Sequence, residues 1–253
     1  MFDTIILSGL EASSALYNSL HARIDALKSK QITPGLAAIL IGENPASQIY
    51  IRNKTKKFDS LGLKSEIYRL EEGVSEEELL RLINQINNDD TFHGILVQLP
   101  LPNHIDSQKI IHAISPTKDV DGFHPENAGL LSIGTPRFVP CTPKGIMYIL
   151  EHFNIKLHGQ HVVVVGRSNI VGRPVSVLSS LKSLGNATVT ICHSGTSNLK
   201  QFTTQGDIVV AAMGSPEFLD ASFIKEGACL VDVGINRIER DGKSTIVGDI
   251  NQA

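Results

Sequence analysis

The sequence predicts an α/β protein with two domains, each built on a mostly parallel sheet. Apolar runs without a polar face, such as "GLAAILIG" and "HVVVVG", alternate along the chain with segments of helical periodicity. A strand that is apolar on both faces belongs in a parallel sheet covered by helices. The length of 253 residues, with 42% hydrophobic content, provides a substantial core for one large domain or two smaller ones.

The first half is expected to hold three strands, near "GLAAILIG", "SEIYRLE" and "GILVQLPLP". A helical stripe of leucines and an isoleucine over 16–27 precedes the first strand, and a helix over 47–62 follows it. A further helix begins at Ser75, where Glu78 completes a capping box. These elements predict one α/β layer set over residues 1–140.

The composition then turns to proline, glycine and charge in "SPTKDVDGFHPENAG" and "RFVPCTPKG". This change predicts loops and a domain boundary, with the second domain over 141–253. Its helix "TPKGIMYILEHF" leads to four apolar strands in "HVVVVG", "ATVTIC", "DIVVAAMG" and "CLVDVGIN". This pattern is typical of a doubly wound nucleotide-binding domain, and a hairpin is expected to turn at Asp241 and Gly242.

Charge and cysteine content exclude several classes of partner. The net charge is −3, from 23 Lys plus Arg against 26 Asp plus Glu, and no basic block marks a nucleic-acid or membrane surface. The three cysteines are far apart and in no metal-ligand spacing, so we expect reduced thiols and no metal site. The start of the chain lacks the features of a signal peptide, which predicts a soluble, cytoplasmic protein with a small-molecule partner.

The helix over 47–62 carries a lysine in an unusual place. On a helical wheel Ile51 and Phe58 fall on the apolar side, and Lys54 projects between Phe58 and Leu61 rather than with the other charges. Tyr50 lies one turn earlier on the same edge, where it could flank a planar ligand. Burial lowers the pKa of a lysine toward neutrality, which makes Lys54 a candidate base. The alternative is a lysine whose stem covers apolar surface while its ammonium group stays in water.

Two polar residues of the same half support a site around this lysine. Gln98 ends an apolar strand, and in open α/β sheets ligands gather beyond the carboxyl ends of the strands. Asp121 in "KDVDG" could accept hydrogen bonds from an amino-substituted heterocycle, although an ordinary Asp-Gly turn explains it equally well.

The second domain contains a candidate dinucleotide site. "VVVVGRSNIVGRPVSVLSSL" runs from a strand through Gly166 into a helix that starts near Gly172, and such a helix start presents free N–H groups to a phosphate. The spacing departs from G-x-G-x-x-G, so a purely structural turn remains an alternative. The next strand ends in His193 and Ser194 instead of an acid. Arg167 and Ser194 could therefore meet a 2′-phosphate, which favours NADP over NAD, while His193 is interpreted as a plain loop histidine.

Taken together, these segments resemble the bifunctional methylenetetrahydrofolate dehydrogenase/cyclohydrolase family over nearly the whole chain. "YIRNKTKK" is similar to the family's Y-x-x-x-K segment, and "EEELLRLINQINNDDTFHGILVQLPLP" resembles its long signature. "KDVDGFH", "PCTPKG" and "GRSNIVGRP" follow in the family's order. The resemblance implies a Rossmann-like C-terminal domain, an N-terminal substrate domain and an active-site cleft between them.

The resemblance also implies the activity and the residue roles. Methylene-tetrahydrofolate would be oxidised by NADP to the methenyl form, which would then be hydrolysed to formyl-tetrahydrofolate, in a cytoplasmic homodimer. Lys54 matches the catalytic lysine, Gln98 would position it, and Tyr50 would pack against the folate. Ser47 lies near the substrate, and Asp121 matches the residue that grips the pterin. The cofactor would contact Gly166, Arg167, Ser168, Ile170, Gly172 and Ser194, with Cys141, Ile235 and Asn236 near the nicotinamide.

One departure from the family pattern leaves alternatives open. The sequence stops at "VGDINQA", whereas family members continue with a P-V-P-G-G-V-G-P-M-T segment and a helix that packs on the first domain. Its absence is expected to remove one wall of the cleft. A monofunctional NAD(P)-dependent dehydrogenase and a non-catalytic NADP- or folate-binding form are the alternatives. An NADP enzyme acting on a small keto acid is disfavoured, because it leaves Tyr50, Gln98 and Asp121 unexplained.

Overall fold

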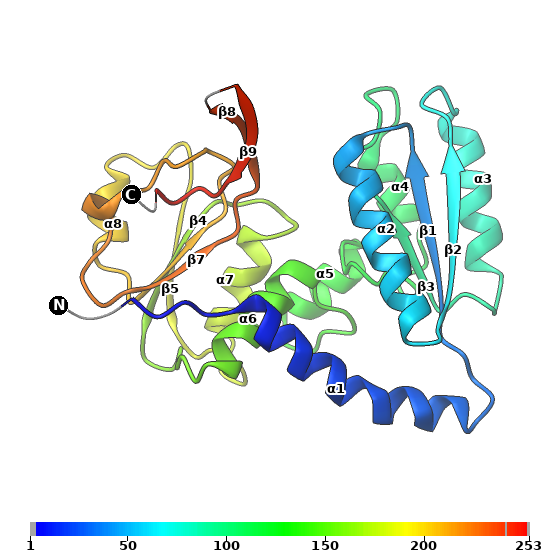
Figure 1. Cartoon of the computed structure of the whole chain (residues 1–253), viewed down its shortest axis with the longest axis horizontal. Helices are drawn as coiled ribbons and strands as arrows, with labels where there is room; N and C mark the ends of the chain where they lie inside the picture. The colour runs from blue at the N-terminus through cyan, green and yellow to red at the C-terminus, as the bar shows by residue number, and fades with distance from the viewer. Residues whose placement is uncertain (1–3, 241, 252–253) are drawn as a thin grey trace. The chain divides into compact units, whose positions relative to one another are not determined.

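The computed structural model describes residues 4–240 and 242–251, which form two compact units (Figure 1). The N-terminal unit spans Ser8–Gly129, and the C-terminal unit takes in the described residues from Leu130 onward together with residues 4–7. The domain limits predicted at 140 and 141 stay a prediction. In the part of the chain that is described, no helix combines the length and the apolarity needed to cross a membrane.

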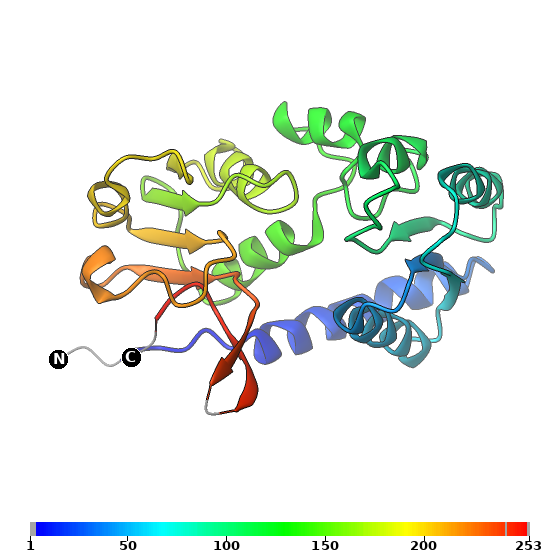
Figure 2. The ribbon, with the colours of Figure 1, turned by 90° about the horizontal axis from the view of Figure 1, so that it is seen from above.

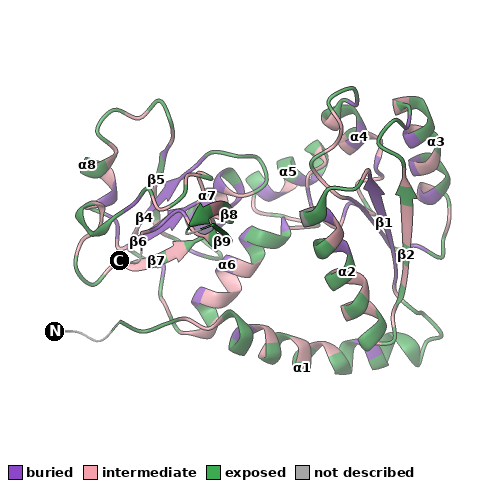
Figure 3. Ribbon diagram, turned by 45° about the horizontal axis from the view of Figure 1, so that its top comes forward, coloured by how far each residue is buried: buried purple, intermediate pink, exposed green. Residues whose placement is uncertain are grey.

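The N-terminal unit is built on a three-stranded parallel sheet in the order β2-β1-β3. The central strand β1 (Gly35–Ile41) is buried along its whole length, between β2 (Lys64–Leu70) and β3 (Gly94–Val97) (Figure 3). Alternate residues of β1 enter two different hydrophobic clusters, one on each face of the sheet. The sheet is therefore covered on both sides, as the apolar runs predicted.

The first three helices of this unit follow the predicted periodicity, whereas the fourth was not predicted. They are α1 (Gly9–Lys28), α2 (Pro45–Ser60), α3 (Glu76–Asn87) and α4 (Ser107–Ala113). On α3 Ser75 is confirmed as the N-cap, because its Oγ accepts the Glu78 N–H at 3.2 Å. Leu79, Ile83 and Ile86 on its apolar face are buried.

Part of the stretch that was predicted to be loop is helical. The helix α5 (Pro125–Ser132) begins inside "SPTKDVDGFHPENAG". Proline at a first helical position loses no hydrogen bond, because that N–H group would have no helical partner. The Ala128 N–H donates to the carbonyl of His124 at 2.9 Å, which closes the first turn. Counting prolines and glycines therefore underestimated the helix content here.

The C-terminal unit contains a four-stranded parallel sheet in the order β5-β4-β6-β7. Its strands match the four predicted apolar runs: β4 (His161–Val165), β5 (Thr188–Cys192), β6 (Ile208–Ala211) and β7 (Cys229–Asp232). The hydrophobic clusters on the two faces share the buried valines of β4 between them, Val162 and Val164 on one side and Val163 and Val165 on the other. This order changes direction between β4 and β6, which creates the switch point of a doubly wound sheet.

The remaining elements of the unit connect these strands. They are α6 (Cys141–His152), α7 (Gly172–Ser180), α8 (Leu199–Thr203) and the short 3-10 helix η1 (Ala221–Phe223). The predicted hairpin is present as β8 (Asn236–Arg240) paired with β9 (Lys243–Val247), and it extends away from the sheet (Figure 2). Gly242 has a φ of +71°, and Asp241 lies outside the described residues.

Candidate active site and dinucleotide site

Three predicted site residues lie on α2. The helix begins earlier than predicted, because Pro45 suits its first turn and Oδ1 of Asn44 accepts the Ser47 N–H at 3.1 Å. Ser47 is buried, and Tyr50 keeps 44% of its surface exposed. Lys54 is half-buried one turn after Tyr50, as the helical wheel predicted.

Gln98 lies directly after β3 and has an incomplete set of hydrogen bonds. Its main-chain N–H donates to the Ile39 carbonyl at 2.9 Å, which continues the pairing of β3 with β1. In the side chain, Nε2 donates to the Leu99 carbonyl at 2.8 Å. The Oε1 atom is buried and has no hydrogen-bond partner among the described residues. A buried acceptor without a partner costs about 1–3 kcal/mol, so this oxygen is suited to a donor from a ligand or from a lysine.

The packing of α2 places Lys54 on the side of the helix that faces this sheet. Ile51, three residues before Lys54, is fully buried in one cluster with Leu40 of β1 and Leu96 of β3. Residues three apart share a helix face. Lys54 therefore lies over the same sheet whose strand β3 leads into Gln98.

Asp121 lies in a loop that a second acid stabilises. Asp119 is buried, and its Oδ2 accepts the His124 N–H and the Asn127 Nδ2–H, both at 2.8 Å. Asp121 itself is half-buried. Sequence reasoning singled out Asp121 and missed Asp119 and Asn127. The other acid of "KDVDG", Asp119, was visible in the sequence, but its partner Asn127 in α5 could not be inferred without the fold.

The loop between β4 and α7 requires both of its glycines. Gly166 has a φ of +133°, and a Cβ atom there would lie 2.1 Å from the Ala212 carbonyl oxygen. A Cβ at Gly172 would lie 2.2 Å from the carbonyl oxygen of Gly166. Oγ of Ser168 accepts the Val171 N–H at 3.1 Å, which fixes the start of the helix. Ile170 is exposed on this loop. The close backbone approach fits the glycine requirement of a phosphate-binding turn.

Arg167 of this loop meets His193 at the end of β5. Nδ1 of His193 accepts the Gly195 N–H at 3.0 Å, so the proton of a neutral ring is on Nε2. That Nε2 lies 3.4 Å from Nη1 of Arg167. Both nitrogen atoms then carry a hydrogen and act as hydrogen-bond donors. Two donors at this separation are suited to a shared anion. The interpretation of His193 as a plain loop histidine did not anticipate this arrangement; Ser194 is its exposed neighbour.

Three further predicted residues belong to the same unit. Cys141 is the first residue of α6 and is exposed, and Ile235 is 65% exposed. Asn236 donates from Nδ2 to Oδ1 of Asp249 at 2.8 Å. The predicted folate residues thus lie in the N-terminal unit, and the predicted cofactor residues lie in the C-terminal unit.

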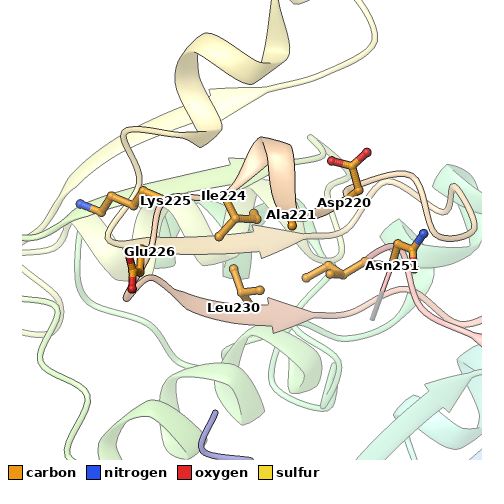
Figure 4. Close-up of a pocket in the computed structure, with 8 residues that line it drawn as sticks. Asp220, Ala221, Ile224, Lys225, Glu226, Leu230 and Asn251 are labelled. Atoms are coloured by element: carbon orange, nitrogen blue, oxygen red, sulfur yellow. The ribbon is translucent and has the colours of Figure 1, made fainter. Parts of the chain in front are cut away.

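A separate surface pocket of about 440 Å³ lies in the C-terminal unit between η1 and β7 (Figure 4). Its lining includes Ile224, Leu230 and Ile250, together with Lys225 and Glu226. None of the predicted site residues lines it. The carboxyl ends of the strands are the better place for a dinucleotide, because they carry the glycine loop and the donors described above.

The similarity of the chain to known proteins decides its family. Residues 7–121 match the model of the tetrahydrofolate dehydrogenase/cyclohydrolase catalytic domain, and residues 140–253 match that of its NAD(P)-binding domain. The chain belongs to the tetrahydrofolate dehydrogenase/cyclohydrolase family. The resemblance read from the sequence motifs is confirmed.

Relatives and solved structures agree with this assignment. The bifunctional protein FolD of Ruminiclostridium cellulolyticum is 50% identical over 248 residues, which cover 98% of this chain and 85% of that protein. The crystal structure of FolD from Campylobacter jejuni has a TM-score of 0.92 at 46% identity, covering 98% of this chain and 86% of that one. The enzyme of Trypanosoma brucei, solved with an NADP cofactor and an inhibitor, has a TM-score of 0.92 at 34% identity, with coverages of 99% and 86%.

Proposed function

We propose that this chain oxidises methylene-tetrahydrofolate to methenyl-tetrahydrofolate with NADP and then hydrolyses the product to formyl-tetrahydrofolate. The observation that carries this proposal is the 50% identity to a bifunctional FolD protein over 98% of the chain. The unpartnered oxygen of Gln98 and the half-buried Lys54 of α2 support a hydrolytic site in the N-terminal unit.

The oxidation needs orientation more than acid-base chemistry. NADP supplies the hydride acceptor, and the protein holds two flat rings in register. Tyr50 packs against the folate, and Asp121 accepts hydrogen bonds from the amino-substituted pterin. Gly166 and Gly172 allow the backbone to approach the pyrophosphate. Arg167 and Ser194 contact the 2′-phosphate, and NAD, which lacks this phosphate, is the poorer cofactor.

The hydrolysis needs a proton acceptor. Water adds to the methenyl carbon and loses a proton to the amine of Lys54. The hydroxyl proton of the adduct then passes to one nitrogen as its bond to that carbon breaks, and the formyl group stays on the other nitrogen. The Oε1 atom of Gln98 accepts a hydrogen bond from the Lys54 amine and holds it toward the substrate. Ser47 lies near the substrate at the start of the same helix. Cys141, Ile235 and Asn236 lie beside the nicotinamide, and Ser168 and Ile170 complete the cofactor loop.

The proposal also covers assembly and location. We infer a homodimer formed through the C-terminal unit, whose β8–β9 hairpin exposes Ile246 at 66%. Light scattering during size-exclusion chromatography measures the mass directly. We further infer a cytoplasmic location, consistent with three cysteines that are far apart in the sequence and odd in number.

The test follows NADPH and methenyl-tetrahydrofolate together by absorbance while the protein turns over methylene-tetrahydrofolate. NADPH formation with formyl product and little methenyl intermediate is the expected result. Persistent methenyl-tetrahydrofolate identifies a dehydrogenase alone, and binding of either ligand without NADPH identifies a non-catalytic form.

Replacing Lys54 separates the two steps. We expect Lys54→Met to reduce hydrolysis of methenyl-tetrahydrofolate by at least about 100-fold, the size of a general acid-base contribution, with a much smaller effect on folate affinity. Lys56→Met, at an exposed position of the same helix, is the matched control and should leave both unchanged. Equal hydrolysis by Lys54→Met and the unmodified protein would exclude the proton-acceptor role.

A further inference from the structure

One buried carboxylate ties together two loops of the C-terminal unit. Asp249 has no exposed surface. Its Oδ2 accepts the N–H groups of Met213 and Gly214 at 2.7 and 3.0 Å, and its Oδ1 accepts that of Ser215 at 2.9 Å. These three residues follow β6. The fourth donor, Nδ2 of Asn236, comes from the segment that follows β7.

A second carboxylate fixes Asp249 in turn. Oδ1 of Asp232, the last residue of β7, accepts the N–H groups of Gly234 and Asp249, and its Oδ2 accepts that of Ile250. A Cβ atom at Gly234 would lie 2.3 Å from Oδ1 of Asp249, so only glycine lets the chain pass this close. The position of Asp249 is thus determined from both sides.

This arrangement determines which way the Asn236 amide points. A carboxylate oxygen with no proton only accepts, so the Asn236 atom facing Asp249 is the NH₂ nitrogen. The Oδ1 atom of Asn236 therefore lies on the side away from Asp249. The hydrogen bond to Asp249 therefore fixes the Asn236 side chain and leaves its Oδ1 available as an acceptor.

The place of these loops in the sheet indicates what they face. A dinucleotide crosses a doubly wound sheet at its switch point, with its pyrophosphate on the first strand–helix turn and the adenine ribose at the end of the next strand. Here that turn follows β4 and carries Arg167, and His193, which contacts Arg167, follows β5. The nicotinamide then falls on the opposite side, over the ends of β6 and β7.

We propose that Asp249 is a positioning residue for the side chain of Asn236. In the orientation that Asp249 holds, Oδ1 of Asn236 accepts a hydrogen bond from the carboxamide NH₂ of the nicotinamide. This inference rests on the proposed function, because it requires that the C-terminal unit binds NADP. It assigns to Asp249 a part in recognising the reactive end of the cofactor. Neither the composition nor the glycine loop reveals that part.

The test compares the dissociation constants of NADP and of its 3-acetylpyridine analogue, measured by calorimetry. The analogue keeps the carbonyl group and replaces the NH₂ by a methyl group, so it cannot donate this hydrogen bond. We expect the unmodified protein to prefer NADP by about tenfold, the size of one hydrogen bond. Asp249→Asn and Asn236→Leu, the second of which removes the acceptor itself, should reduce this preference to within about twofold of unity.

The preference is independent of a general loss of structure, because a distorted site weakens both ligands together. Adenosine 2′,5′-bisphosphate, which has no nicotinamide, should bind the variants and the unmodified protein equally. The double variant Asn236→Asp with Asp249→Asn restores a donor opposite an acceptor and should regain part of the preference. If Asp249→Asn does not fold, Asn236→Leu tests the same contact by removing its acceptor.

Each of the following results would contradict one part of this proposal. Absence of NADP binding to the unmodified protein contradicts the proposed function. NADP binding without preference over the analogue contradicts only the inference about the carboxamide. A preference that survives in Asp249→Asn contradicts the role of Asp249, and one that survives in Asn236→Leu contradicts the carboxamide contact.

Discussion

Arg167 and His193 form the most specific electrostatic feature of the C-terminal unit. Two donors 3.4 Å apart favour an anion between them, and the 2′-phosphate is the group that distinguishes NADP from NAD. We expect Arg167→Ala to weaken NADP by at least about tenfold and NAD by much less, because a charge-assisted hydrogen bond contributes about 1.5–3 kcal/mol. His193→Ala should weaken NADP in the same direction by a smaller factor. Calorimetric titration with both dinucleotides measures this, and an unchanged ratio in Arg167→Ala would contradict the phosphate assignment.

Asp207, directly before β6, predicts a pH-dependent free energy of unfolding. Its Oδ2 accepts the His161 N–H at 2.7 Å, and its other oxygen pairs with Lys225. The hydrogen bond from His161, followed by that from Lys225, lowers the pKa of the Asp207 carboxyl below its ordinary value. Its contribution is therefore fully present above the unfolded-state pKa of about 3.9 and is lost as the pH falls through the lower folded-state pKa.

Asp207→Asn should consequently lower the free energy of unfolding by about 1 kcal/mol at pH 7, allowing for the partial exposure of the pair. Urea unfolding at pH 7 and pH 3 should show this difference shrinking at the lower pH. Asp90→Asn, at an exposed position, is the control and should change little. A difference of constant size at both pH values would mean that the variant acts through packing instead of charge.

Some residues of the site could be found from sequence, and others could not. Lys54 and Gln98 stand out because each is a polar residue within an apolar pattern, on a helix face and at a strand end. Arg167 stands out because it lies in the glycine loop. Asp119 and Asp249 do not, because only the fold shows which donors reach them: those of Asp119 are His124 and Asn127, and those of Asp249 lie far along the chain. The hydrogen bonds of Asp249 reach back 34 to 36 residues to the loop after β6. No local periodicity reports such a contact.

At the scale of elements, the glycine loop between β4 and α7 makes a testable demand. Gly172→Ala would place its Cβ 2.2 Å from the Gly166 carbonyl oxygen, so the loop must shift. We expect a loss of about 1–3 kcal/mol in the free energy of unfolding, as for other overpacked sites, and weaker NADP binding. Chemical denaturation and calorimetry measure the two effects.

Gly145→Ala in α6 is the matched control for that substitution. Apart from the neighbouring backbone of its own helix, no atom of the described residues lies within 4 Å of its Cβ position. Alanine there should raise the free energy of unfolding by about 0.5–1 kcal/mol, because glycine loses more backbone entropy in a helix. If Gly172→Ala raised the free energy of unfolding as Gly145→Ala does, the close approach of the loop would not require glycine at position 172.

The same scale shows why most elements could be predicted. Strands apolar on both faces and helices with a clear stripe, such as β1, β4 and α3, are determined by burial, which sequence periodicity reports directly. The helix α5 was assigned to a loop because Pro125 and Gly129 were taken as breakers. A proline at a helix start and a glycine with no neighbouring atom within 4 Å are both compatible with a short helix.

At the scale of the molecule, each unit has a hydrophobic core of its own. The clusters around β1 contain residues of the N-terminal unit alone, and those around β4 contain residues of the C-terminal unit alone. A ligand stabilises a unit only against unfolding that destroys the binding site of that ligand. NADP should therefore protect one core and leave the other unchanged.

Hydrogen exchange measures this selectivity strand by strand. At 100 times its dissociation constant NADP adds about 2.7 kcal/mol to the state that binds it, which slows exchange through unfolding of that state by about 100-fold. We expect this protection at the amides of β4 and β6 and none at those of β1 and β3. Equal protection of all four strands would mean that the two units unfold as one cooperative body. The folate site would then be stabilised by the cofactor before any folate binds.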